Sequence, residues 1–282
     1  MNKTLAKKNT LSLLLNLIVI IMLVITLYPV IVMISVSLKK LNDVFSVPVT
    51  LIPKDFSFEN YLQVFKKMNI TSGFISSIII TVGTIVLITS ISIPAAFAFS
   101  KLDFYGKKPL YFLVLVSQMF APVIIIIPLY SLLNKINLID TYPSLILMNT
   151  TFNLAFIILM LKSTFDSVPK EVGEAAKIDG CNSIMTLLKI YVPVSTTGIA
   201  VAIIFAFTRT WNEFLFSFTF MSTTNKKPII VSLYEILKNN PTLGVPWHYV
   251  MTGAVYTTVP LVVLFLLIRN YITGGHTEGA IK

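Results

Sequence analysis

Charged residues are scarce in this chain of 282 residues. Only 22 basic and 12 acidic side chains are present, so 12% of the residues are charged, against about 25% in a typical soluble domain. Apolar residues make up 55%. So little charge cannot cover a soluble core of this size, which argues against a soluble enzyme. The composition also excludes disorder, which requires low hydrophobicity and high charge.

Side chains that bind metals or act as nucleophiles are few as well. Cys181 is the one cysteine, which excludes an intrachain disulfide and a metal cluster held by thiolates. His248 and His276 are the two histidines, and neither has neighbours in the sequence that would make a metal or acid–base site, so we interpret both as structural. The pattern G-x-x-x-x-G-K-[ST] is absent, which predicts that the chain has no ATP site of its own.

What the chain does have is long apolar runs. Each is long enough to cross a bilayer, which takes about 20 residues. The six predicted spans cover residues 11–36, 73–99, 109–133, 142–161, 194–221 and 249–268. The first has a basic flank like a signal peptide, but its apolar run of about 25 residues exceeds the usual length of about 7–15, so we expect a retained helix. Pro122 and Pro128 in the third segment predict a bent helix that borders a pathway.

The net charge of +10 raises nucleic-acid binding as a possibility. The lysines, however, cluster in short polar segments between apolar runs, a pattern that anionic lipid and membrane orientation explain better. Three of them lie within the loop 101–108. The excess of Lys and Arg in this loop and at the N-terminus predicts that both termini lie on the inner side of the membrane.

The segment between the fourth and fifth spans has the pattern of a helix-turn-helix outside the bilayer. Pro169 suits a first helical position, and Gly180 suits a left-handed residue at the helix end. Asn182 or Ser183 is expected to cap a second helix. Apolar residues at helical spacing predict one buried face on that helix; they are Ile184, Leu187, Leu188 and Tyr191. Ala175 and Ala176 give the first helix a small face that suits docking into a partner.

This segment resembles the "EAA" loop of ABC importer permeases, whose pattern is EAA-x3-G-x9-I-x-L-P. The matching residues are Glu174, Ala175, Ala176, Gly180, Ile190 and Pro193, with Val192 in place of the leucine. Further stretches similar to the family are Ser37-Leu38-Lys39, residues 95–102, residues 127–130 and 138–142, Trp211-Asn212-Glu213-Phe214, and the tail from Gly274 to Lys282. The resemblance covers nearly the whole chain and is closest to the carbohydrate branch, to the smaller partner of the maltose-type permease pair.

The resemblance implies an all-α membrane protein with six transmembrane helices and a cytoplasmic coupling loop, the type I ABC importer permease architecture. The six matching residues of the loop would couple the chain to two copies of a cytoplasmic ABC ATPase, which uses ATP and Mg. A second, distinct permease subunit and an extracytoplasmic sugar-binding protein are the other expected partners. The resemblance also implies a bacterial cell membrane protein, with no cofactor, metal or nucleic acid bound to this chain.

We divide the chain into an N-terminal part, residues 1–72, and a five-helix permease core, residues 73–282, with the coupling loop at 165–193. The external segment 222–247 corresponds to a family loop that can enter the binding protein, although a plain polar connector explains its residues equally well.

Candidate pathway residues lie in the fifth apolar segment and are Arg209, Trp211, Asn212 and Glu213. Arg209 and Glu213 lie at positions i and i+4 of this segment, so we expect them to share a helix face. They would then contact the transported substrate or neutralise each other. An ion-coupled secondary transporter is the alternative function, but it would need further buried charges in a second half. An intramembrane enzyme would need a catalytic set in the spans, and none is present.

Overall fold

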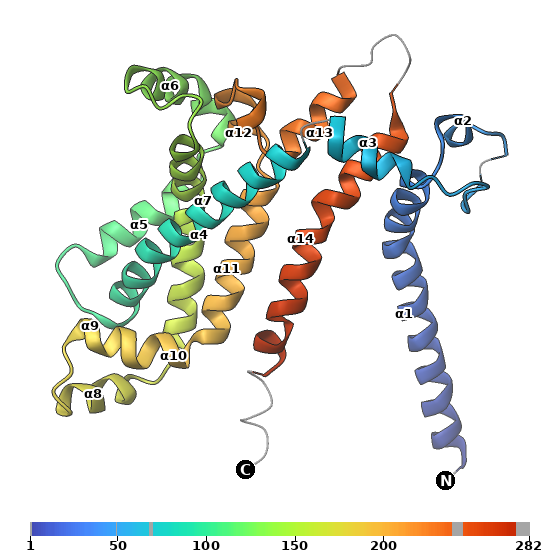
Figure 1. Cartoon of the computed structure of the whole chain (residues 1–282). Coiled ribbons are helices and arrows are strands. Elements are labelled where there is room, and N and C mark those ends of the chain that lie inside the picture. Colours follow the sequence, from blue (N-terminus) through green and yellow to red (C-terminus); the bar gives the residue numbers. More distant parts are fainter. Residues whose placement is uncertain (1, 49, 68–69, 239–244, 275–282) are drawn as a thin grey trace. The chain divides into compact units, whose positions relative to one another are not determined.

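The computed structural model describes residues 2–48, 50–67, 70–238 and 245–274, with side chains described for 12–48, 50–66, 70–238 and 245–269. The described part is helical and contains no strand (Figure 1). It divides into two compact units, one of residues 1–68 and 233–258 and the other of residues 69–232 and 259–282. The tail after residue 274, with His276, and residues 239–244 of the external segment lie outside the described residues.

The first unit contains helices from both ends of the chain. They are α1 (Asn2–Ser37), α2 (Leu41–Val44), α3 (Glu59–Lys67), most of α13 (Ile229–Lys238) and the first part of α14 (Trp247–Gly274). Side chains of two of these helices form hydrogen bonds with the C-terminal end of α1. The Asn60 amide donates hydrogen bonds of 2.8 Å to the carbonyls of Ser37 and Lys39, and the Thr252 hydroxyl donates one of 3.2 Å to Ser37. These bonds satisfy carbonyls that a helix end leaves without partners.

The second unit contains most of the predicted permease core, but not residues 233–258, which belong to the first unit. Its elements are α4 (Ile70–Lys101), α5 (Lys107–Ser117), α6 (Pro122–Lys135), α7 (Tyr142–Asp166), α8 (Lys170–Ile178), α9 (Ser183–Thr186), the π-helix η1 (Leu187–Tyr191), α10 (Val192–Val194), α11 (Thr196–Trp211), α12 (Leu215–Phe220) and the 3-10 helix η2 (Thr224–Lys226). Helices α4, α7 and α11 pack together around a core that includes Ile88, Ile157 and Ala202. The small Ala202 and Ala206 of α11 are both buried, which lets α11 approach its neighbours closely.

Among the described residues, four helices are long and apolar enough to cross a membrane, and there are up to six candidate spans if each of two bent helix pairs counts as one span. One bent pair is Ser183–Val194 followed by Thr196–Trp211, at 83°, and the other confirms one prediction about the apolar segments. The third apolar segment is α5 followed by α6 at an angle of 99°. This confirms the predicted bend, and α6 begins at Pro122, where the missing N–H is tolerated. The fifth segment is not one helix, because α11 ends at Trp211 and α12 begins at Leu215.

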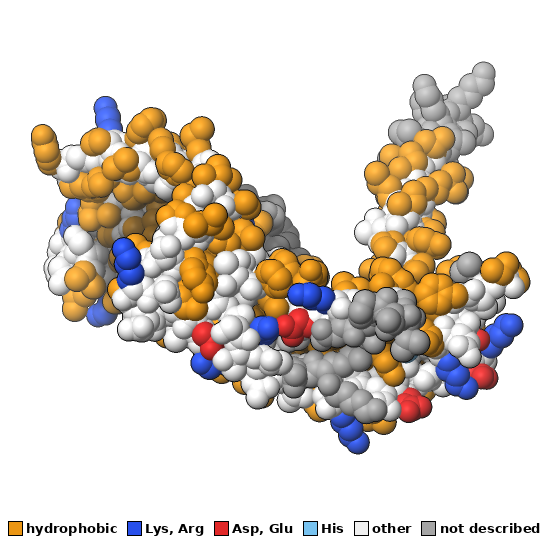
Figure 2. All heavy atoms as spheres, turned by 90° about the horizontal axis from the view of Figure 1, so that it is seen from above, with side chains coloured by type: hydrophobic (Ala, Val, Ile, Leu, Met, Phe, Trp, Pro, Cys, Tyr) orange, Lys and Arg blue, Asp and Glu red, His pale blue; other side chains and the backbone are white. Residues whose placement is uncertain are grey.

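The surface of the chain is largely apolar. The window of highest hydropathy in α1, within Ser12–Ser37, is not buried at all, and large hydrophobic side chains along α5 and α14 are exposed as well. Hydrophobic side chains dominate the face shown in Figure 2, where charged residues are sparse. So much exposed apolar surface is compatible with lipid or partner helices around the chain and not with water.

Asp140 ties the connection between α6 and α7 to the segment after α12. Its carboxylate accepts hydrogen bonds of 3.0 Å from the backbone N–H groups of Ser222 and Thr223, a further one from the Thr223 hydroxyl, and lies 3.4 Å from the Lys226 ammonium. Burial by itself would raise the pKa of Asp140. The hydrogen bonds and Lys226 outweigh burial and lower the pKa from 3.8 to about 2.

This lowered pKa predicts an acid-sensitive contact. Because the folded pKa lies below the unfolded one, the stabilisation is complete above about pH 4 and is lost as the pH falls towards 2. We expect Asp140→Asn to reduce the free energy of unfolding at neutral pH by about 1–3 kcal/mol. We also expect it to weaken the dependence of that free energy on pH between about pH 4 and 2. Thermal unfolding of the purified protein in detergent would measure both. Asp55→Asn, at an exposed ion pair, is the control; an Asp140→Asn profile equal to that of the unchanged protein would contradict the prediction.

Candidate functional site

The predicted coupling loop folds as a helix, a tight turn and a second helix. Helix α8 begins after Pro169, one residue later than predicted, and Glu171 lies in its first turn, where a carboxylate favours the helix dipole. At its end Gly180 has φ of 81°, as predicted. The N–H of Cys181 donates to the carbonyl of Ala176 at 2.9 Å and that of Gly180 to Lys177 at 3.1 Å, which is the Schellman arrangement.

The second helix of the loop is capped by Asn182, one of the two predicted caps. Its side-chain oxygen accepts a hydrogen bond of 2.8 Å from the N–H of Met185. The chain then continues through α9, η1 and α10, so that Ile190 lies in η1 and Pro193 in the first turn of α10. The predicted buried face is only half right, because Leu187 and Tyr191 are buried whereas Ile184 and Leu188 are exposed.

Tyr191 anchors the loop to the permease core. Its ring makes edge contacts with Phe97 of α4 and Phe165 of α7, with centroid distances of 5.1 and 6.1 Å. Helix α8 lies directly against it: a Cβ atom added to Gly173 would come within 2.7 Å of the Tyr191 hydroxyl. Helix α8 is therefore in contact with α4 and α7 through one buried aromatic cluster, which the sequence did not reveal.

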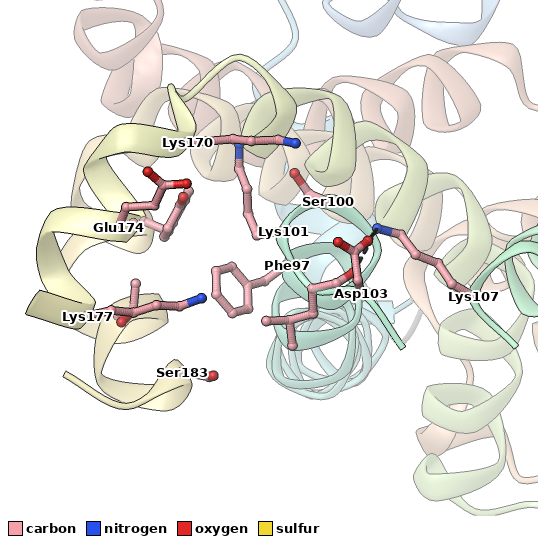
Figure 3. Close-up of a pocket in the computed structure, with 13 residues that line it drawn as sticks. Phe97, Ser100, Lys101, Asp103, Lys107, Lys170, Glu174, Lys177 and Ser183 are labelled. Carbon is pink, nitrogen blue, oxygen red and sulfur yellow. Dashed lines mark hydrogen bonds and ion pairs between the residues drawn. The ribbon is translucent and has the colours of Figure 1, made fainter. Parts of the chain in front are cut away.

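The two alanines of the EAA pattern face different surroundings. Ala176 is buried within the chain, and Ala175 is exposed. The expectation that both form one docking face is therefore wrong for Ala176, which packs inside the loop. Glu174 is exposed at the rim of a cavity of about 280 Å³ between α8 and the end of α4, where Lys177 also points (Figure 3).

A second cavity, of about 330 Å³, lies beside the break between α5 and α6 and the break between α11 and α12. It is lined by Ser117, Gln118, Phe120, Pro122, Asn149, Phe152, Asn153, Arg209, Glu213, Leu215 and Phe216. Amide groups, one residue of each charge and aromatic rings thus converge on one space. Polar groups that fix orientation, set among aromatic side chains, are typical of small-molecule sites.

Arg209 and Glu213 face this cavity but do not pair with each other in the described part of the chain. The Arg209 guanidinium lies 4.5 Å from the centre of the Phe156 ring and 3.5 Å from the side-chain oxygen of Asn153. The carboxylate of Glu213 accepts hydrogen bonds from the N–H of Phe216, at 2.6 Å, and from the N–H and hydroxyl of Ser217, at 3.0 and 2.9 Å. Glu213 thereby caps the start of α12.

The other two candidate pathway residues do not line this cavity. Trp211 is buried, stacked on Phe207 at 5.4 Å and in edge contact with Phe74 at 5.6 Å. Its ring therefore packs within the core. The Asn212 amide donates a hydrogen bond of 2.9 Å to the Thr208 carbonyl, so it helps to end α11.

Comparisons with known proteins agree with this architecture. Residues 88–274 match the family described as the inner membrane component of binding-protein-dependent transport systems. The chain is 32% identical over 258 residues to the trehalose transport system permease protein SugB of Mycobacterium tuberculosis, covering 91% of this chain and 92% of the relative. It is 30% identical over 267 residues to the trehalose/maltose transport system permease protein MalG of Thermococcus litoralis, covering 93% and 94%.

A solved structure shows the same fold. It is that of a bacterial ABC transporter involved in the import of the acidic polysaccharide alginate, and one of its chains has a TM-score of 0.81 and 21% identity, with 93% of this chain and 96% of that chain covered. The chain thus belongs to the family of inner membrane components of binding-protein-dependent transport systems. It is an integral membrane permease subunit of an ABC importer with the type I fold, and the matches do not support the ion-coupled alternative.

Proposed function

We propose that this permease subunit takes up a sugar or oligosaccharide by alternating access, together with a second, distinct permease subunit. Relatives named for trehalose, trehalose/maltose and diacetylchitobiose transport support a saccharide substrate. The observation that carries the proposal is the cavity beside the α5–α6 and α11–α12 breaks. Its amides, Arg209 and Glu213 can bind hydroxyl groups, and its aromatic rings can pack against the face of a sugar.

The coupling loop is the element through which an ATPase would act. We assign the contact to Glu174, Ala175, Gly180, Ile190 and Pro193, while the buried Ala176 packs α8 inside the loop. Exposed Ala175, Ile184 and Leu188 supply apolar surface for such a partner, and the cluster around Tyr191 links that surface to α4 and α7. ATP and Mg would be used by two copies of a separate cytoplasmic ATPase, with the coupling loop and both chain termini on the cytoplasmic side. An extracytoplasmic binding protein would deliver the sugar on the opposite side.

Reconstitution tests this proposal. The chain, its partner permease and the ATPase in proteoliposomes should take up a labelled saccharide from a panel only with its binding protein outside and ATP inside. Uptake driven by a proton gradient without ATP, or no saccharide uptake with all components assembled, would contradict it.

Within this system Arg209→Ala should raise the sugar concentration that gives half-maximal uptake by about tenfold, since it removes a charged group from the cavity. Lys135→Ala, at the exposed end of α6, is the control and should leave uptake unchanged.

A further inference from the structure

The cavity beside α8 continues into a second recess between the ends of three spans. The two share Ser100, Asp103 and Lys107, and their volumes are about 280 and 420 Å³. We call them together the basic recess. It is defined by Phe97, Phe99, Ser100, Lys101, Leu102, Asp103, Lys107, Lys108, Tyr111, Lys162, Lys170, Gly173, Glu174, Lys177, Ser183, Thr186 and Tyr191.

The charge of the recess is strongly positive. Six lysines line it, against the two carboxylates of Asp103 and Glu174. The lysines come from four helices, α4, α5, α7 and α8, so the fold gathers charges that are far apart in the sequence. Like charges brought together in this way repel one another, which leaves the recess incomplete without a counter-ion.

The pairing of the lysines shows where positive charge remains. Lys107 lies 3.4 Å from Asp103, and Lys162 lies 2.6 Å from Asp166. Lys101 donates a hydrogen bond of 2.6 Å to the carbonyl of Val168 and lies 5.5 Å from the centre of the Tyr191 ring, and it forms no ion pair in the part of the chain that the structure describes.

Three more lysines, Lys108, Lys170 and Lys177, form no ion pair within the described residues. In Figure 3, Lys170 and Lys177 extend from α8 towards the side chains at the end of α4. The uncompensated ammonium groups thus face the recess from more than one side.

The other lining groups suit a phosphate. Lysine binds phosphate as a point charge, and the hydroxyls of Ser183 and Tyr191 border the same space, whereas the Ser100 hydroxyl donates a hydrogen bond of 2.6 Å to Asp166. The recess also lies at the ends of the candidate spans α4 and α7 and at the start of α5, and headgroups are expected where an apolar span ends. Next to it, Leu110, Phe112 and Leu113 of α5 are exposed, so acyl chains could extend along α5.

From these observations we infer that the basic recess binds a phosphate group, and that the bound phosphate ties α8 to the α4–α5 connection. An anionic phospholipid is one source of that group and a soluble phosphate ester is the other. Occupancy would restrain the same helix that receives the motion of the ATPase. The recess would then make coupling responsive to the membrane or to the phosphorylated contents of the cell.

The test compares Lys170→Gln/Lys177→Gln with Lys54→Gln/Lys66→Gln, a pair of exposed lysines in the first unit that removes the same charge. Both are assembled with the partner subunits in nanodiscs of phosphatidylcholine, alone or with an equal share of phosphatidylglycerol. Retained phosphatidylglycerol is measured by native mass spectrometry, and binding of glycerol phosphate is measured by titration in phosphatidylcholine alone. Neither measurement depends on transport.

We expect the recess variant to bind one of the two probes about tenfold more weakly than the unchanged protein, and the control variant to bind it equally well. If the recess variant loses retained phosphatidylglycerol but binds glycerol phosphate normally, the source of the phosphate is a lipid. If it loses binding of glycerol phosphate, the source is a soluble ester. Lys170→Arg/Lys177→Arg should restore binding. If neither probe distinguishes the recess variant from the control, the inference is wrong. If the double variant fails to assemble, the same binding measurements are made on the exposed single variant Lys177→Gln, for which we expect a smaller loss of probe binding.

Discussion

Replacing Gly180 with valine is expected to lower ATP-driven uptake by about tenfold while ATP hydrolysis continues. Gly180 has φ of 81°, and a left-handed backbone costs an L-residue about 1–2 kcal/mol, more for a β-branched side chain. A Cβ at this position meets no atom within 4 Å, so the effect would come from backbone strain and not from a clash. The turn would open, and α8 would no longer be held in the position in which we propose that it contacts the ATPase.

Gly180→Asn is the matched control, because asparagine tolerates the left-handed conformation. We expect it to retain most of the uptake. Uptake and ATP hydrolysis would be measured on the same proteoliposomes, after assembly with the partner subunits is verified. Equal uptake by the valine and asparagine variants would exclude the turn as the coupling element, and loss of hydrolysis together with uptake would indicate failed docking and not uncoupling.

The local features of the coupling loop could be predicted because they depend on neighbouring residues. A glycine at a helix end and an asparagine before the next helix are sufficient to predict the Schellman turn and the cap, and the structure has both. The contact of Gly173 with Tyr191 could not be predicted, since it joins residues on different helices. The periodicity of Ile184 and Leu188 predicts that they share a face with Leu187 and Tyr191 but not how much of that face the chain itself covers.

The spans show the same limit. Hydropathy located every apolar segment, and Pro122 indicated the bend in the third. The break at residues 212–214 contains no proline or glycine, and the N-cap residue of α12 is Phe214, which is not a favoured cap, so neither of these local signals marks the break. The carboxylate of Glu213 makes the break possible, because it satisfies donors at the start of α12. Whether the break is stable depends on contacts in the folded structure and not on the neighbouring sequence.

The second large effect is therefore expected at Glu213. Alanine there removes both carboxylate oxygens and leaves the N–H groups of Phe216 and Ser217 without their acceptors, at a cost of about 3 kcal/mol. Since α12 then loses its cap, the break between α11 and α12 would shift, and the cavity that Arg209 faces would change shape. We expect Glu213→Ala to lower the maximal uptake rate by more than tenfold and to reduce thermal stability.

A graded series separates this capping role from direct contact with sugar. Ser217→Ala removes only the hydrogen bond from the hydroxyl and should have a small effect on stability and uptake. Glu213→Gln keeps one acceptor oxygen, so its effect should be larger than that of Ser217→Ala and smaller than that of Glu213→Ala. If capping is what matters, stability and maximal rate fall in parallel through the series, and the half-saturating sugar concentration changes little. A rise in that concentration with unchanged stability would show that Glu213 acts on the sugar directly. Unchanged transport in Glu213→Gln and Glu213→Ala would remove this residue from the pathway, and with it the argument that the break in the fifth segment shapes the cavity.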